Sequence, residues 1–140
     1  MEAKKLKSFK ELIVWQKAYK LVLEIYKFTD NFPKFETYGL TQQVRRAAIS
    51  IPSNIAEGYG RKHKTDYHRF LSIAYASLLE LETQYMLAVD LGYAKQSVTV
   101  GGLLKEVGGM LYRIMYPQKR VEGGKTAPLT PTPYTLNPKS

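Results

Sequence analysis

The chain has 140 residues, of which 44% are hydrophobic, and its formal net charge is +9 at pH 7. This length and apolar content predict one domain with one hydrophobic core. The chain has no cysteine, which excludes disulfides and thiolate metal sites and suits a reducing compartment. No apolar run approaches the roughly 18 residues of a membrane span, and residues 1–10 lack the apolar region of a signal peptide. We therefore expect a cytoplasmic protein with no membrane partner, whose positive charge favours polyanionic partners.

The first predicted helix runs from about Phe9 to Thr29, after a basic N-terminal tail of residues 1–8. Apolar and aromatic residues recur in it at spacings of three and four, which predicts a buried seam. The residues of this seam are Leu12, Trp15, Tyr19, Val22, Tyr26 and Thr29. Pro33 ends the helix, because the residue before a proline is disfavoured in the helical region.

The stretch from Gly39 to Gly58 carries two regular stripes at helical spacing. The apolar stripe, which predicts a face in the core, consists of Leu40, Val44, Ala48, Ile51 and Ile55. The polar stripe consists of Gln43, Arg46, Ser50, Asn54 and Glu57. Pro52 lies inside the pattern, where a proline removes one backbone donor and clashes with the preceding turn. We predict one helix with a kink near Ala48 to Pro52, rather than two helices.

The third predicted helix opens at Thr65 or Asp66, whose side chains can cap it, and runs to about Leu91. Its seam consists of Tyr67, Leu71, Ala74, Leu78, Leu81, Tyr85, Ala88 and Gly92. Further apolar residues lie outside the seam, namely Ile73, Leu79, Met86, Leu87 and Leu91. A helix in a small bundle normally keeps a polar outer face, so this surplus predicts that another subunit covers part of the helix.

The fourth predicted helix runs from about Ser97 to Tyr116. Its seam consists of Val100, Leu104, Val107, Leu111 and Ile114. It also contains Gly101, Gly102, Gly108 and Gly109, and each glycine costs about 1 kcal/mol of helix stability relative to alanine. Close approach of a neighbouring helix and loose local helicity both remain open as explanations. Residues 119–140 are rich in proline and threonine and poor in apolar residues, which predicts a disordered tail.

Four helices with short connections predict an all-α fold, an up-down-up-down antiparallel four-helix bundle over residues 9–118. This topology brings the N-terminus, the second connection and the C-terminus to one end. The basic residues collected there are Lys4, Lys5, Lys7, Lys10, Arg61, Lys62, Lys64, Lys119 and Arg120. The opposite end is nearly neutral, with Asp30, Lys34, Glu36, Asp90 and Lys95. Three basic segments that converge on one end predict a surface that binds a polyanion.

A family resemblance extends from about Phe9 to Met115. Its most specific run is Gln43 followed by Arg45-Arg46-Ala47 and then Ser50-Ile51-Pro52-Ser53-Asn54-Ile55-Ala56-Glu57-Gly58, with Trp15-Gln16-Lys17-Ala18 before it and Ser77 and Glu80-Leu81-Glu82 after it. The chain resembles the bundle proteins encoded by intervening sequences of bacterial 23S ribosomal RNA genes, also labelled S23 ribosomal proteins. The resemblance implies a four-helix bundle in a ring-shaped homo-oligomer, with a pentamer favoured. Related accessory variability proteins of diversity-generating retroelements imply association with structured RNA and a reverse transcriptase. A ribosomal particle is the other partner that the resemblance implies.

The residues give little support to an enzyme, and we expect none, with no cofactor and no metal site. His63 and His68 are five residues apart, so they point in different directions on a helix and do not form a metal pair. Arg61 and His68 formally fit the Arg-x4-6-His spacing of HEPN-type ribonucleases, which are also helical bundles. This pairing arises easily by chance in a basic loop, so RNA cleavage is the less favoured alternative.

A protein-interaction scaffold without an RNA role is the second alternative. The polar stripe of the second helix and Glu80 would then form the contact between subunits, with the interface residues Gln43, Arg46, Ser50, Asn54, Glu57 and Glu80. Arg45 and Arg46 are the cations that Glu57, Glu80 and Glu82 would pair with, in the same or a neighbouring subunit. This alternative accounts for the polar stripe but leaves the basic end unexplained. The sequence therefore favours an RNA-associated, non-enzymatic homo-oligomer.

Overall fold

The structure is a computed structural model that describes residues 7–117, 119–120 and 126–127. Its main elements are four helices, α1 (Ile13–Thr29), α2 (Leu40–Tyr59), α3 (Lys64–Asp90) and α4 (Val98–Met115). Short 3-10 turns, η1 and η2, occupy Phe9–Glu11 and Lys34–Glu36. After α4, strand β1 (Lys119–Arg120) pairs antiparallel with strand β2 (Thr126–Ala127). Most of the tail predicted to be disordered lies outside the described residues, but these two strands depart from that prediction.

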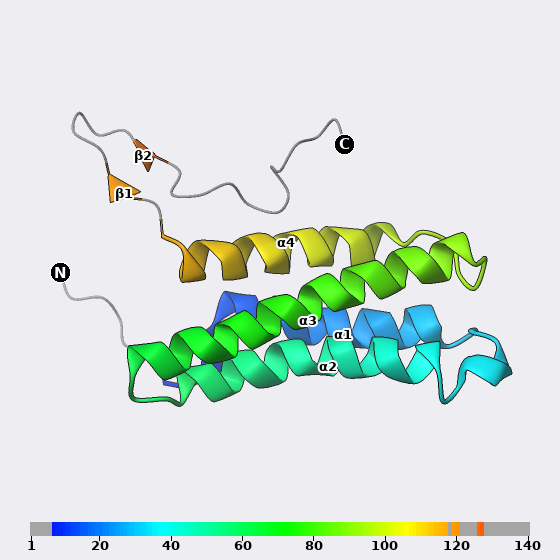
Figure 1. Cartoon of the computed structure of the whole chain (residues 1–140), viewed down its shortest axis with the longest axis horizontal. Helices are drawn as coiled ribbons and strands as arrows, with labels where there is room; N and C mark the ends of the chain where they lie inside the picture. The colour runs from blue at the N-terminus through cyan, green and yellow to red at the C-terminus, as the bar shows by residue number, and fades with distance from the viewer. Residues whose placement is uncertain (1–6, 118, 121–125, 128–140) are drawn as a thin grey trace.

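The four helices run alternately up and down and form an antiparallel bundle (Figure 1). α1 packs against α2 and α4, and α3 packs against the same two helices, so each helix has two neighbours around a common core. The α2–α3 connection lies at the same end as the start of α1 and the end of α4 (Figure 1). The all-α fold and the topology predicted from the sequence are therefore confirmed.

The core follows the predicted seams of α2 and α3 closely. α2 is a single helix that contains Pro52, and its buried residues include Val44, Ala48, Ile51 and Ile55. The buried residues of α3 include Leu71, Ala74, Leu78, Leu81, Tyr85 and Ala88. Met86, Leu87 and Leu91, which the pattern places outside the seam, are each about half exposed. Both helices thus bury the face that their periodicity indicates.

The predicted seam of α1 is wrong for Tyr19 and Tyr26, which are exposed, whereas Leu12, Trp15 and Val22 are partly buried against the core and lie beside the face that is fully buried. The helix begins at Ile13 because Leu12 is extended, with ψ of 125°, after the η1 turn. Its buried residues are Val14, Ala18, Leu21, Ile25 and Thr29, of which only Thr29 belongs to the predicted seam. Tyr19 and Tyr26 are 51% and 39% exposed. α1 carries apolar residues on most of its faces, so its periodicity does not single out one of them. Aromatic residues with a polar tip suit the boundary between core and solvent, whereas the smaller aliphatic residues fill the interior.

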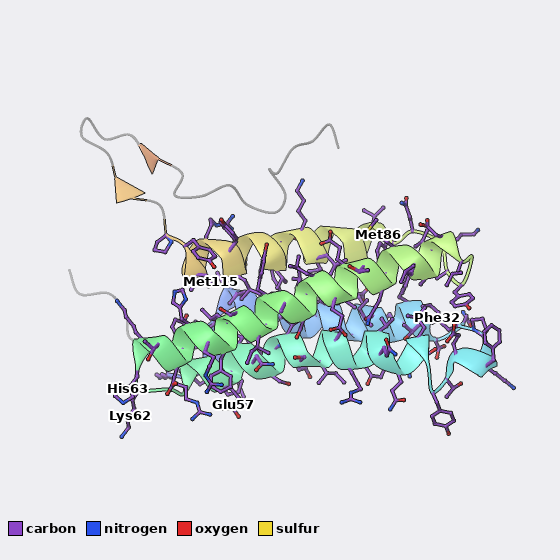
Figure 2. The ribbon with its side chains drawn as sticks, in the orientation of Figure 1. Phe32, Glu57, Lys62, His63, Met86 and Met115 are labelled. Carbon is purple, nitrogen blue, oxygen red and sulfur yellow. The ribbon has the colours of Figure 1, made fainter. Side chains whose placement is uncertain are left out.

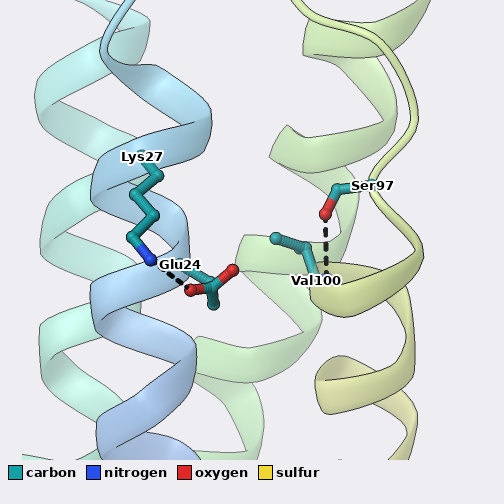
Figure 3. Close-up of polar contacts among 4 residues, drawn as sticks. All are labelled: Glu24, Lys27, Ser97 and Val100. Atoms are coloured by element: carbon teal, nitrogen blue, oxygen red, sulfur yellow. Dashed lines mark hydrogen bonds and ion pairs between the residues drawn. The ribbon is translucent and has the colours of Figure 1, made fainter.

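The ends of α3 and α4 also differ from prediction. α3 begins at Lys64 with His63 as an extended N-cap that makes no side-chain capping bond, so neither Thr65 nor Asp66 is the cap. Ser97 does cap α4, since its Oγ accepts a hydrogen bond from the Val100 amide at 3.1 Å (Figure 3). Figure 3 also shows the surface pair of Glu24 and Lys27 on α1.

The last turn and the glycines of α4 give two further corrections. Ile114, predicted for the seam, is 38% exposed, and Met115 fills the last core position instead. A Cβ built at Gly101 or Gly102 would meet no atom within 4 Å. Close approach of a helix within this chain therefore does not explain these two glycines.

Glu36 organises the neutral end of the bundle. Its Oε1 accepts a hydrogen bond from the Leu40 amide at 3.0 Å and so caps α2, while its Oε2 accepts one from the Tyr93 hydroxyl at 2.9 Å. The ring of Tyr93 also packs on Phe32 and Phe35, with centroids 5.6 Å and 6.1 Å away. One carboxylate thus ties the start of α2 to the connection between α3 and α4.

We expect the protein to lose stability at alkaline pH through Tyr93. The hydrogen bond to Glu36, followed by desolvation and the charge of Glu36, raises the pKa of Tyr93 above its ordinary value of 10.0. Because the folded-state pKa is raised, the stabilising contribution is complete below pH 10.0 and is lost as the pH rises through the folded-state pKa. Urea unfolding at several pH values measures the effect. Above pH 10.0, the free energy of unfolding of Tyr93→Phe should fall less with rising pH than that of the wild type. Equal pH sensitivity of the two proteins would contradict this role.

Candidate nucleic-acid interface

Exposed basic side chains gather at the end of the bundle where α2 passes to α3. Those described are Lys7 and Lys10 before α1, and Arg61, Lys62 and Lys64 at the α2–α3 connection. Figure 2 labels Glu57, Lys62 and His63 at this end, with Phe32 at the other. Lys119 and Arg120 form β1, just after α4, and Lys4 and Lys5 lie outside the described residues. The structure thus brings basic residues from separate segments to one end, called the basic end below.

Gly58 allows α2 and α3 to meet closely at the basic end. A Cβ at this position would lie 3.2 Å from Cβ of Phe70 and 3.3 Å from Cδ1 of Tyr67, closer than most real contacts. Burial at the same junction raises the pKa of Tyr67. Gly60 then caps α2, since its amide donates to the carbonyls of Ala56 and Glu57. The tight junction leaves residues 61–64 exposed.

Two arginines at this junction are held against one aromatic ring. The guanidinium carbons of Arg61 and Arg69 lie 4.7 Å and 4.6 Å from the ring centroid of Phe70. Arg61 also pairs with Glu57 at 3.1 Å, and Arg69 lies 4.0 Å from the Asp66 carboxylate. Such cation–π contacts contribute about 0.5 to 1 kcal/mol at exposed sites. The arginines are therefore positioned but partly neutralised by the acids.

Lys62 and Lys64 differ from these arginines, because neither takes part in an ion pair among the described residues. Their ammonium groups remain available to an outside anion. Sequence reasoning included both lysines but missed Arg69 and Phe70. The spacing of Asp66 and Arg69 on one helix face is a sequence signal that could have indicated Arg69.

The predicted polar stripe of α2 lies partly inside the subunit. Ser50 Oγ and Ser77 Oγ are 2.8 Å apart and join α2 to α3. Asn54 Nδ2 donates to the carbonyl and the hydroxyl oxygen of Ser50, at 2.8 Å and 2.9 Å. Gln43, Arg46 and Glu57 of the stripe are exposed, as is Glu80 on α3, whose Oε1 accepts a hydrogen bond from Gln84. These exposed residues form the part of the predicted subunit interface that stays accessible.

Arg45 makes its described contacts with α1 of its own subunit. Its Nε donates to the hydroxyl of Thr29 at 2.8 Å, and its guanidinium carbon lies 4.4 Å from the ring centroid of Tyr26. Both partners belong to α1 of the same chain, so within the subunit Arg45 does not pair with the glutamates that the sequence suggested. It fastens α2 to α1 instead.

The two residues of the HEPN-type spacing have different neighbours. Arg61 contacts Glu57 and Phe70, whereas the ring of His68 faces Tyr116 of α4, with centroids 6.5 Å apart. Within the described residues, no group of three or more histidine, cysteine, aspartate and glutamate side chains is placed to hold a metal ion. None of the helices in this part of the chain is both long and apolar enough to cross a membrane.

Comparison with known proteins agrees with the bundle and its sequence motifs. No curated protein matches the chain. A solved structure of a protein with unknown function from the S23 ribosomal protein family of Bacteroides thetaiotaomicron VPI-5482 superposes with a TM-score of 0.65 at 23% sequence identity. That similarity covers 74% of this chain and 98% of the other and establishes a shared fold. The family profile described as 23S rRNA-intervening sequence protein matches residues 10–113, which include parts of all four helices. The chain therefore belongs to the 23S rRNA-intervening sequence protein family.

Proposed function

We propose that the protein is a non-enzymatic homo-oligomer that binds structured RNA through its basic end. The observation that carries this proposal is the exposure of Lys62 and Lys64, which take part in no ion pair among the described residues, at the same end as Lys7 and Lys10 from a separate segment. Ammonium groups in such a cluster neutralise phosphates without reading bases. Membership of a family named for ribosomal RNA intervening sequences supports an RNA partner.

An oligomer would strengthen this surface. In a cyclic ring whose axis runs along the bundles, each subunit presents its basic end to the same side, because rotation about that axis leaves the direction along it unchanged. Charges that are weak individually then add across subunits, and several weak contacts to one RNA act together. The proposed assembly and the proposed RNA surface therefore support each other.

The salt dependence of RNA binding tests the proposal. For a labelled RNA hairpin, the logarithm of the affinity should fall linearly with the logarithm of salt concentration, with a slope of about −0.9 for each phosphate neutralised. If the five described basic residues of one subunit each meet a phosphate, the slope is roughly −4 to −5. A flat salt response, or no binding at low salt, would favour the alternative of a protein-interaction scaffold.

Sedimentation provides the matching test of assembly. Ile73, Leu87 and Leu91 expose apolar surface on α3, and residues of the polar stripe are exposed on α2, so we propose that these two helices make the subunit contact. The family resemblance favours five subunits of 16.0 kDa. A 16.0 kDa species at micromolar concentration would contradict the proposal.

The proposal that no RNA is cleaved has its own test. We expect RNA to stay intact on incubation with the wild type, with His68→Ala indistinguishable from it. Cleavage that is lost in His68→Ala would instead support the HEPN-like alternative.

The genomic neighbourhood distinguishes the two RNA contexts. A reverse transcriptase gene with template and variable repeats beside this reading frame would support a retroelement accessory role. Location within a 23S ribosomal RNA gene would support an intervening-sequence role with a ribosomal partner.

A further inference from the structure

A row of aromatic rings crosses from the core to the surface where α3 and α4 meet at the basic end. Tyr75 lies 6.1 Å from Tyr112, Tyr112 lies 4.9 Å from Tyr116, and Tyr116 lies 6.5 Å from His68, measured between ring centroids. Tyr75 and His68 belong to α3, while Tyr112 and Tyr116 come from the last turn and the C-cap of α4. The row thus joins the two helices and ends outside the bundle.

Exposure increases along this row. Tyr75 is 8% exposed and belongs to the core, Tyr112 is half-buried, and Tyr116 is 43% exposed. His68 is also exposed. The Tyr116 amide donates to the Tyr112 carbonyl at 2.8 Å, and the two rings pack together, so Tyr116 is anchored from both its backbone and its ring. An anchored, exposed ring loses little conformational entropy when a planar ligand stacks on it.

Basic residues lie near the exposed rings in the sequence. Lys64 lies one helical turn before His68 on α3. Arg113 lies in the last turn of α4, three residues before Tyr116, and its guanidinium extends back along the helix, where its Nη1 would be 3.3 Å from a Cβ at Gly109. Both cations are exposed. Aromatic rings beside a positively charged track are the arrangement that binds single-stranded nucleic acid, because bases stack on the rings while cations follow the phosphates.

Phe70 provides an internal contrast. It lies two residues after His68, but the guanidinium groups of Arg61 and Arg69 already lie over its ring. Tyr116 has no such cation among the described cation–π contacts. Of these two rings, Tyr116 is therefore the one we assign to base stacking.

We propose that Tyr116, with His68 beside it, stacks an unpaired base of the bound RNA, so that the basic end prefers single-stranded segments to continuous duplex. This inference rests on the proposed function and names its ligand more closely, since unpaired bases occur in the loops and bulges of structured RNA. Duplex RNA keeps its bases stacked on each other, so only its phosphates would contact the protein, through the lysines.

The test compares a 12-nucleotide oligouridine with a 12-base-pair RNA duplex, using full-length protein and fluorescence anisotropy. Tyr116→Ala should lower the affinity for oligouridine roughly 5- to 150-fold, the range that base–aromatic stacking gives on alanine substitution. Duplex affinity should change less than about twofold, and the salt slope should stay the same, because no charge is removed. Tyr116→Leu, which keeps apolar volume without an aromatic face, should resemble Tyr116→Ala, whereas Tyr116→Trp should bind like the wild type.

Tyr38→Ala is the matched control, because Tyr38 is 90% exposed at the opposite end of the bundle, and we expect it to bind both RNAs as the wild type does. Equal weakening of oligouridine and duplex binding by Tyr116→Ala, or wild-type binding by Tyr116→Leu, would overturn base stacking. In either case, salt-dependent duplex binding by the wild type would leave the proposed function standing. If the wild type binds neither RNA, both proposals are overturned together.

Discussion

Reversing Arg61, Lys62 and Lys64 to glutamate is expected to lower RNA affinity about a hundredfold at physiological salt. When the logarithm of affinity is plotted against the logarithm of salt concentration, each phosphate contact contributes about 0.9 to the slope. Losing three contacts therefore lowers the affinity by about two powers of ten near 0.15 M salt. The salt slope should become shallower by roughly 3 for the same reason. All RNA sequences should be affected alike, because contacts to phosphates do not read bases. Anisotropy titrations over a range of salt concentrations measure both quantities.

The contacts of Arg61 call for a second variant. Reversal at Arg61 would break its pair with Glu57 and place two carboxylates close together, whereas Lys62 and Lys64 have no acidic partner among the described ion pairs. Exposed ion pairs contribute about 0 to 1 kcal/mol, so the triple variant should lose at most a little stability. The double variant Lys62→Glu with Lys64→Glu should lose RNA affinity without any measurable loss of stability in urea unfolding.

A matched control reverses two lysines at the opposite end. Lys34 and Lys95 are exposed there, and changing both to glutamate alters the net charge as much as changing Lys62 and Lys64 does. If net charge alone governed binding, the two double variants would be equally weak. If the site lies at the basic end, the Lys34 and Lys95 variant should bind much more tightly than its counterpart.

Changes at Arg45 and Arg46 should disturb packing or assembly before they disturb RNA binding. Arg45 holds α2 against Thr29 and Tyr26 of α1, so its loss weakens the bundle itself. A different result would show that the RNA surface is not the basic end. In that result, the variants of Lys62 and Lys64 bind RNA normally, whereas a variant with Arg45 and Arg46 changed forms an intact oligomer but does not bind RNA.

The sequence predicted the parts of the fold that a single dominant stripe determines. In α2 the apolar stripe has a clear polar counterpart, and its predicted core residues Val44, Ala48, Ile51 and Ile55 are buried. The location of the basic end followed from topology alone, because short connections force neighbouring helices to be antiparallel. Such inferences need only the order of the elements and one clear face on each of them.

The rotation of α1 could not be predicted in this way. Its apolar residues fit two series with the same spacing, one through Tyr19 and Val22 and another through Ala18 and Leu21. Periodicity does not choose between them. The choice depends on which set of side chains fills the space between the other three helices, and the compact aliphatic set does so.

The finer features of the basic end were also beyond the sequence. The contacts of Phe70 with Arg61, and of His68 with Tyr116, join different helices or connections. They depend on the relative rotation of α3 and its neighbours, and an error of one residue in a seam turns a side chain by about 100°. Sequence reasoning could place these residues near the basic end but could not pair them.

The largest effect on stability is expected from Leu21→Ala. Leu21 is fully buried at 0% exposure, and leucine-to-alanine substitutions in cores cost about 2 to 5 kcal/mol because they remove transfer free energy and leave a cavity. Such a loss is a large part of the 5 to 15 kcal/mol by which domains are typically stable. Urea unfolding monitored by circular dichroism, at a protein concentration that keeps the assembly state constant, measures the change.

Leu23→Ala is the matched control, since the same substitution two residues away on α1 alters a side chain that is 51% exposed. Surface substitutions usually change stability by within about 0.5 kcal/mol. The seam predicted from the sequence runs through Val22 and places Leu21 and Leu23 symmetrically on either side, so it implies similar costs for the two. The buried face of α1 implies instead that Leu21→Ala lowers the free energy of unfolding several times as much as Leu23→Ala does. Equal losses in the two variants would show that α1 is rotated differently from the structure, whereas a small loss for Leu23→Ala with unchanged sedimentation would also exclude this residue from the subunit contact.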